Sequence, residues 1–404
     1  MESPTMDHDL NPRVEAMQPS ATLAMSARAK ALKREGRPVI ALSAGEPDFD
    51  TPEPIREAGQ RAIQEGHTHY TANPGTPELR AAIARKLEAD NGLAYEPGDI
   101  VCSNGAKQSV AQAVVVLCRP GDEVVIPAPY WVSYPEMTRL AGAEPVTVET
   151  SAAQGYKMQP EALEAALSGR SRLLMLNSPS NPTGAVYSAA ELDAFAEVLR
   201  GYEDVIVIAD EIYEHVIYDA EHVSFASRPG MKERTVTING FSKAYAMTGW
   251  RLGYLAAPRW IAEATAKVQS QFTSAPSAVT QQAGIAALEM DPEPVRQMVR
   301  AFRERRAFVL AALDRMPGVA CPRPEGAFYL FPDISHYLGT TAPSGRSIET
   351  STDLCFYLLE EHDVALVPGD AFGAPSGVRL SYAASAGDLR AAMQRIETGL
   401  AALR

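Results

Sequence analysis

Lys243 has the residue type and the surroundings of a reactive amine. It lies in a turn of small and hydroxyl residues, directly after the β-branched, alternating segment 235–239, which predicts a β-strand. A lysine at a strand end can be aimed at one small-molecule carbonyl, and burial of its amine promotes loss of the proton and Schiff-base formation. Arg251, later in the same stretch, carries a planar guanidinium that suits phosphate oxygens. The alternative is a surface loop with a solvated lysine and an arginine ion pair.

Asp210 ends a second apolar strand, predicted over 204–210, and Tyr213 follows on the same segment. An acidic side chain in a buried strand is costly unless a cation or a hydrogen-bond donor lies beside it. We therefore expect Asp210 to face a cation or a donor.

Two further segments could bind phosphate or a flat ring. The strand 99–103 runs through Gly105 into a helix predicted over 107–118, and the free amides and dipole of a helix start favour phosphate. Many α/β proteins contain such a unit, so it is a weak signal by itself. Trp131 follows the strand 120–127, where it could stack on a flat ring or simply anchor the core.

Asn181 and Arg379 each have a structural and a functional interpretation. Asn181 lies in a Ser-Pro-Ser-Asn-Pro-Thr-Gly run after the apolar strand 171–177, and an Asn-Pro pair predicts a turn in any protein. Arg379 lies in the apolar strand 378–382, where an unpaired charge would be costly. It either forms a structural salt bridge or binds an anion.

These stretches together resemble the class I aminotransferases, which are fold-type-I, pyridoxal-phosphate-dependent transferases. The matching runs are Gly-Phe-Ser-Lys at Lys243 with Gly-x-Arg-hydrophobic-Gly behind it, Ser-Pro-x-Asn-Pro-Thr-Gly at Asn181, and Arg-hydrophobic-Ser-Tyr-Ala at Arg379. The resemblance covers the chain after residue 10, and it is strongest to bacterial aspartate aminotransferases and the allied prephenate aminotransferases. One departure is Gly240, where many relatives carry serine, so phosphate contacts would depend more on Ser242 and backbone amides.

The resemblance implies a set of cofactor contacts. Lys243 would hold pyridoxal 5′-phosphate through a Schiff base and, once freed by the incoming amino group, act as the base that moves the substrate's Cα proton. Asp210 would keep the pyridine nitrogen protonated, which makes the ring an electron sink. Asn181 and the third catalytic residue, Tyr213, would bind the ring oxygen, and Trp131 would stack on the ring. The remaining cofactor contacts would come from Ala106, Lys107, Ser242, Arg251 and, across a dimer interface, Tyr70 of a second copy.

The same resemblance implies how substrates bind. Arg379 would clamp the α-carboxylate, and Gly45 would let the backbone approach that carboxylate. Lys107 would meet the distal carboxylate of a dicarboxylic substrate, with Thr22 nearby; a merely solvated Lys107 is the alternative. Gln18 stands where relatives that accept prephenate usually carry a lysine, and it supplies no charge. Aspartate and glutamate are therefore expected to be good substrates and prephenate a poor one. The other substrate contacts would come from Trp131 and Asn181.

The expected function is that of an aspartate aminotransferase, which converts L-aspartate and 2-oxoglutarate to oxaloacetate and L-glutamate by a ping-pong mechanism. Three alternatives stay open. One is a bifunctional enzyme that also serves as a glutamate/aspartate–prephenate aminotransferase. Another is a pyridoxal-phosphate-dependent lyase of the same fold that cleaves at Cβ. The third is a non-enzymatic regulator with a degenerate version of the fold, against which the intact set of site residues argues.

The elements that position these residues alternate between strands and helices from residue 98 to residue 258. This alternation predicts an α/β fold with a mostly parallel sheet covered by helices on both faces, and the candidate residues fall at strand ends, where open α/β sheets bind ligands. Later segments, including strands at 326–331 and 364–367, predict a smaller α+β domain. We expect a loose tail over 1–13, a small domain from 14–53 and 296–404, and a large pyridoxal-phosphate-binding domain over 54–295.

Composition excludes several classes of protein. The 404 residues exceed what one compact core usually holds, and the net charge of −13 argues against nucleic-acid or anionic-membrane partners. No run reaches the ~18 apolar residues of a membrane span, and the start of the chain does not read as a signal peptide. No metal site is expected, because His67 and His69 lack a third ligand. We expect a cytoplasmic homodimer acting on small amino acids and 2-oxo acids. Free thiols are predicted for the four cysteines, which lack CxxC spacing: Cys102, Cys118, Cys321 and Cys355.

Overall fold

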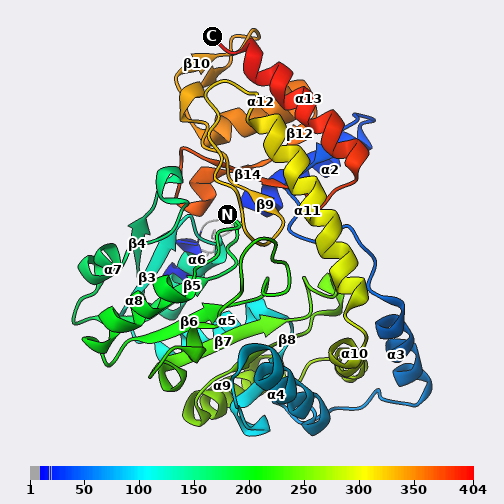
Figure 1. Cartoon of the computed structure of the whole chain (residues 1–404), viewed down its shortest axis with the longest axis vertical. Coiled ribbons are helices and arrows are strands. Elements are labelled where there is room, and N and C mark those ends of the chain that lie inside the picture. The colour runs from blue at the N-terminus through cyan, green and yellow to red at the C-terminus, as the bar shows by residue number, and fades with distance from the viewer. Residues whose placement is uncertain (1–9, 18, 20) are drawn as a thin grey trace, which may run out of the picture.

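A seven-stranded sheet forms the centre of the larger part of the molecule (Figure 1). The computed structural model describes residues 10–17, 19 and 21–404. Strand β8 is antiparallel to both of its neighbours, and the other six strands run in one direction, which confirms the predicted mostly parallel sheet. Across the sheet the strands are β2 (Ile100–Ser103), β8 (Gly253–Ala256), β7 (Thr235–Gly240), β6 (Ile206–Asp210), β5 (Ser171–Asn177), β3 (Glu123–Ala128) and β4 (Glu144–Glu149).

The central strands are apolar on both faces because helices cover both. Side chains alternate across a strand, so Val124 of β3 and Leu173 of β5 face one layer while Val125 and Leu174 face the other. The first layer contains α5 (Ala106–Leu117), α6 (Ser133–Ala141) and α9 (Arg259–Phe272), and the second contains α7 (Pro160–Ala166) and α8 (Ala189–Arg200). The β2–β8 end of the sheet is covered by α3 (Glu53–Gln64), α4 (Pro77–Asn91) and α10 (Ala278–Glu289).

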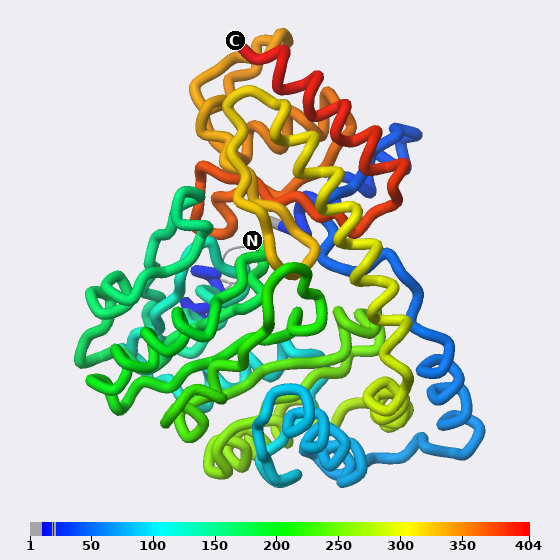
Figure 2. Tube along the Cα trace, viewed as in Figure 1, coloured from blue at the N-terminus to red at the C-terminus, as the bar shows by residue number. Residues whose placement is uncertain are grey.

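A second core lies above the sheet in Figure 1 and joins the two ends of the chain. Strand β1 (Ile40–Ala41) pairs in parallel with β12 (Val364–Ala365), so the blue and orange-red segments lie side by side in Figure 2. A three-stranded antiparallel sheet has the order β13 (Val367–Pro368), β14 (Val378–Ser381), β9 (Tyr329–Leu330). The packed helices are α2 (Ala21–Arg34), α12 (Ser351–His362) and α13 (Ala386–Ala402).

Helix α11 (Glu293–Leu313) connects the two parts of the molecule (Figure 1). Near its start, Val295 packs against the core under β2 and β8, whereas Phe302 and Leu310 belong to the upper core. The division of the chain at 53/54 and 295/296 into a large and a small domain stays a prediction. At the other end of the chain, α1 (Pro12–Glu15) begins within the predicted tail over 1–13, and Arg13 donates a hydrogen bond to the carbonyl of Leu140.

Two predicted strands are wrong in extent. The segment expected as a strand over 326–331 is extended only at β9, because Ala327 has a φ of 55° and turns the backbone before Tyr329. The segment 364–367 is two strands, since β12 pairs with β1 while β13 pairs with β14 in another sheet. A short hairpin of β10 (Thr340–Thr341) and β11 (Ser347–Ile348) completes the strands. In the part of the chain that the structure describes, no helix has the length and apolar character needed to cross a membrane.

Gly253 in β8 gives a test of how tightly the sheet packs against the start of α5. A Cβ at this position would lie 2.2 Å from the backbone nitrogen of Ala106 and 2.6 Å from the carbonyl carbon of Gly105. Because backbone atoms cannot rotate away, we expect Gly253→Ala to lower the free energy of unfolding by about 1–3 kcal/mol, as overpacking does. Thermal and urea unfolding measure this.

The matched control is Gly169→Ala, where a Cβ meets nothing within 4 Å. Equal stability of the two variants would contradict the close contact at Gly253.

Candidate active site

A cavity of about 270 Å³ lies where β5, β6 and β7 end and their chain continues into turns. Asn177 and Asp210 are the last residues of β5 and β6 and lie opposite each other in this parallel pair. Both polar side chains are therefore at the same edge of the sheet. The cavity brings together twelve of the residues selected from the sequence: Thr22, Gly45, Ala106, Lys107, Trp131, Asn181, Asp210, Tyr213, Ser242, Lys243, Arg251 and Arg379.

Lys243 lies in the turn that follows β7, and its amine reaches across to the other part of the chain. Its Nζ donates a hydrogen bond to the carbonyl oxygen of Gly45. Loss of hydration in the cavity, with repulsion from Arg379, lowers the pKa of Lys243 to about 8. The neutral, nucleophilic form of the amine is therefore much more accessible near neutral pH than in an exposed lysine.

Asp210 is a buried carboxylate held by a tyrosine. The hydroxyl of Tyr134 donates a hydrogen bond of 2.7 Å to its Oδ2, and the backbone amide of Ile212 donates one of 3.3 Å to its Oδ1. Burial raises the pKa of Asp210 to about 6, while these hydrogen bonds oppose the rise. The carboxylate is therefore charged at neutral pH, in surroundings that favour a cationic ligand group beside it.

Arg379 is buried, and its guanidinium has partners that carry no charge. It donates 3.0 Å to Oδ1 of Asn181 and 2.8 Å to the carbonyl of Ser43, and it lies over the ring of Tyr329. Among the described residues no carboxylate forms an ion pair with it, and its Nε has no hydrogen-bond partner. The structural salt bridge considered for Arg379 is thus missing from the described part of the chain, and the side chain is available for an anion.

The start of α5 and Arg251 form an anion-binding end of the cavity. Ala106 is the first residue of α5, and Gly105 before it has a φ of 85°, so a side chain there would be strained and would meet Arg251 at 2.4 Å. Arg251 itself is fixed by hydrogen bonds to the carbonyls of Asn104 and Thr248. Free helix amides beside a guanidinium suit a phosphate.

Lys107 and Trp131 form another wall of the cavity. The Nζ of Lys107 lies 5.2 Å from the centre of the Trp131 ring, within the range of a cation–π contact. Burial, with repulsion from Arg251, lowers the pKa of Lys107. Lys107 lines the cavity while much of its side chain stays exposed, so its contact with a distal carboxylate stays a prediction.

Two sequence-selected positions, Tyr70 and Gly240, do not line the cavity, and a third, Gln18, is not described. Tyr70 is fully exposed and does not line the cavity of its own chain, so its contact with a second copy stays a prediction. Gln18 lies outside the described residues. Gly240 is buried against Gly253 and does not line the cavity: a Cβ there would lie 2.8 Å from the Gly253 Cα, which leaves no room for a larger residue without movement.

Sequence reasoning missed three residues of the site. Tyr134 binds Asp210, and Tyr329 shares a 2.9 Å hydrogen bond with the hydroxyl of Tyr213, which was expected to serve only a ligand oxygen. Asn177 donates to the carbonyl of Asp210 and accepts from the amide of Asn181, so it ties two site segments together. Of these three residues, only Asn177 could have been selected from the sequence, because it is a polar residue at the end of an apolar predicted strand.

The chain resembles known proteins along its length. The family model described as aminotransferase class I and II matches residues 37–396. A protein of Petunia hybrida named bifunctional aspartate aminotransferase and glutamate/aspartate-prephenate aminotransferase is 53% identical over 100% of this chain and 85% of its own. An aspartate aminotransferase of Pinus pinaster is 53% identical over 99% of this chain and 82% of its own. The crystal structure of an aspartate aminotransferase from Rhizobium meliloti superposes with a TM-score of 0.95 at 46% identity, covering 98% and 100% of the two chains.

The hydrogen bond between Tyr134 and Asp210 generates a prediction about proton affinity. In Tyr134→Phe the carboxylate loses a donor that stabilises its charged form, so its pKa rises above the present value of about 6. Loss of one hydrogen bond to a charged carboxylate raises its pKa by about 1 to 2. Infrared difference titration of the cofactor-free protein, with Asp210→Asn as the blank, measures this.

Tyr187→Phe is the control, because the Tyr187 hydroxyl accepts from the amide of Met158 and does not bind Asp210. A Tyr134→Phe protein with an unchanged Asp210 titration would contradict the assignment.

Proposed function

The chain belongs to the class I and II aminotransferases, and on that premise we propose that it is an aspartate aminotransferase dependent on pyridoxal 5′-phosphate. It would convert L-aspartate and 2-oxoglutarate to oxaloacetate and L-glutamate. The observation that carries this proposal is the pair of cations in one cavity: Arg379, buried with no carboxylate partner among the described residues, and Lys107 at the start of α5. A dicarboxylic amino acid needs two such groups.

The residues of the cavity fit pyridoxal phosphate. The phosphate would bind at the start of α5 with Ser242 and Arg251, and the ring would lie by Trp131 with its nitrogen toward Asp210. The amine of Lys243, with its pKa lowered to about 8, suits a covalent link to the aldehyde. When bound, pyridoxal phosphate supplies an electron sink that stabilises negative charge at the substrate's Cα.

The chain's own groups would then divide the work of proton transfer and orientation. Lys243 would take the proton from the Cα of the bound amino acid and deliver it to the C4′ carbon of the cofactor. Asp210 would hold a proton on the ring nitrogen, since the charged form of Asp210 is stabilised by the Tyr134 hydroxyl. Tyr213, fixed by Tyr329, and Asn181, fixed by Asn177, orient donors toward the ring oxygen.

Substrate choice would follow from the two cations. Arg379 offers a bidentate fork to the α-carboxylate, and its neutral partners Asn181 and the Ser43 carbonyl leave its charge uncompensated. Lys107 would attract the distal carboxylate, with Thr22 lining the same cavity. Prephenate is the nearest alternative substrate, because the Petunia hybrida relative carries both activities in its name. The uncharged Gln18 is our reason to expect prephenate to be poor.

The assembly and location are parts of the same proposal. We infer a homodimer in which the exposed Tyr70 of each copy reaches the phosphate of the other. A cytoplasmic location is expected from the cysteines, all four of which are free thiols in the structure.

A screen of half-reactions tests the proposed function. We expect the cofactor spectrum of the holoenzyme to convert with aspartate and glutamate at low concentration and only slowly with alanine. Lys107→Met should lower kcat/KM for aspartate by about 10- to 100-fold, the size of a lost charge-assisted contact, and change alanine little. Lys30→Met, an exposed lysine of α2, is the control.

Prephenate distinguishes the alternatives. Wild-type protein should use it poorly and Gln18→Lys better; equal use of prephenate and oxaloacetate by the wild type would replace the proposal with the bifunctional one. Release of pyruvate or ammonia from a single amino acid would instead identify a lyase.

A further inference from the structure

A second cavity, which we call the rear cavity, is larger than the active-site cavity. Its volume is about 900 Å³, against about 270 Å³ for the active-site cavity. It is bounded by the C-terminal half of α4, the end of α10, the start of α11 and the turn that follows β6. None of its lining residues lines the active-site cavity.

The two cavities share a wall made of two catalytic segments. In the turn after β6, Asp210 and Tyr213 line the active site, whereas Glu214 lines the rear cavity. In the turn after β7, Lys243 lines the active site and Tyr245 the rear cavity. A ligand in the rear cavity would therefore contact the same two turns that carry Lys243, Asp210 and Tyr213.

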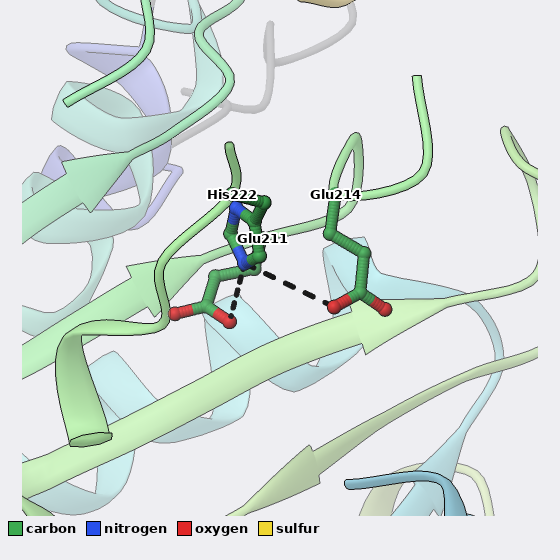
Figure 3. A group of neighbouring side chains, drawn as sticks. All are labelled: Glu211, Glu214 and His222. Carbon is green, nitrogen blue, oxygen red and sulfur yellow. Dashed lines mark hydrogen bonds and ion pairs between the residues drawn. The ribbon is translucent and has the colours of Figure 1, made fainter. Parts of the chain in front are cut away.

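The floor of the rear cavity is a buried network of charges. His222 Nε2 lies 3.2 Å from Glu211 and 3.9 Å from Glu214, and these three side chains face one another (Figure 3). Their types could hold a metal ion, but the ammonium of Lys86 already donates to Glu214, and Asn91 donates to the same carboxylate at 2.8 Å. Lys86 thus already supplies a positive charge to Glu214, and the network forms a fixed floor.

The rim of the cavity favours an anion. Five arginine and lysine side chains line the floor and rim together, against three acidic ones, in a chain whose net charge is −13. Arg296, Arg300 and Arg303 follow one face of α11. Arg300 pairs with Glu293 and Arg303 with Asp219. Arg296 is near enough to Glu293 to attract it, but among the described residues no carboxylate lies within ion-pair distance of Arg296.

The interior supplies apolar contacts and one free hydrogen-bond donor. Leu288, Met290, Val295 and Val299 line one side. Tyr245 is only 9% exposed, and within the described part of the chain its hydroxyl has no hydrogen-bond partner. Burial raises the pKa of Tyr245, so the hydroxyl stays a neutral donor.

We propose that the rear cavity is a second ligand site, which binds a small organic anion with an apolar body and acts on the active site through the shared wall. Its volume lies within the range of small-molecule sites, about 300–1,000 Å³. The anionic group would lie by Arg296, the apolar body against Val295 and Val299, and an acceptor atom by Tyr245. This inference goes beyond the proposed function and does not depend on the identity of the amino-acid substrate.

Calorimetric titration of the holoenzyme with 2-naphthoate tests the site, because this probe has one carboxylate and a flat apolar body. We expect one saturable site per chain. Arg296→Glu should weaken binding by about five- to tenfold, as loss and reversal of a rim charge do, and Tyr245→Phe by about two- to tenfold, as loss of a hydrogen bond does. Arg390→Glu, which changes an exposed arginine of α13, should bind as the wild type does. Equal binding by the two arginine variants, or no saturable binding, would overturn the proposal.

Steady-state kinetics test whether a ligand in the rear cavity affects the active site. Saturating 2-naphthoate should change kcat at saturating amino acid in the wild type, and Arg296→Glu should need a proportionally higher probe concentration. A pure rise in KM that persists unchanged in Arg296→Glu would mean that the probe binds the active-site cavity, and an unaffected kcat would overturn the coupling.

Discussion

The site depends on charged groups that the fold buries with mostly neutral hydrogen-bond partners. Arg379 is 2% exposed with neutral partners, Asp210 is 6% exposed beside a tyrosine, and the amine of Lys243 rests on a carbonyl. Such groups are costly in the protein alone, so each is a place where a ligand of opposite charge gains affinity. The order of these groups along one cavity is what makes the chain suited to a cofactor with a ring nitrogen and a substrate with two carboxylates.

The sheet is what allows this arrangement to persist. Asp210, Asn177 and the turn that carries Lys243 are fixed at the ends of adjacent strands whose side chains are buried on both faces. Close backbone contacts add precision, since Gly253 leaves only enough space for the start of α5. The second core then carries Arg379 on β14 to the opposite side of the cavity, with its hydrogen bond to Asn181 joining the two parts.

Much of this could be predicted because the signals are local. Strand ends, the Lys243 turn and the helix after Gly105 follow from short patterns of apolar and small residues, and family resemblance supplied the roles of the site residues. The rest depends on contacts between distant segments. Tyr134 lies on α6 whereas Asp210 ends β6, and Tyr329 meets Tyr213 from 116 residues farther along the chain. The rear cavity is assembled from α4, α10, α11 and the turn after β6. The overlong strand predicted at 326–331 failed for the same reason, since tertiary contacts place Ala327 at positive φ.

The central claim is that Lys243 is the residue that binds pyridoxal phosphate covalently. Borohydride reduction of the holoprotein makes an imine link permanent, and digestion followed by mass spectrometry locates it. The account predicts a single pyridoxyl group, on the peptide that contains Lys243, and its loss in Lys243→Ala even though Arg251, Asp210 and Asn181 still bind the free cofactor. A pyridoxyl group on Lys107 or another lysine of the wild type, or none at all, would contradict it.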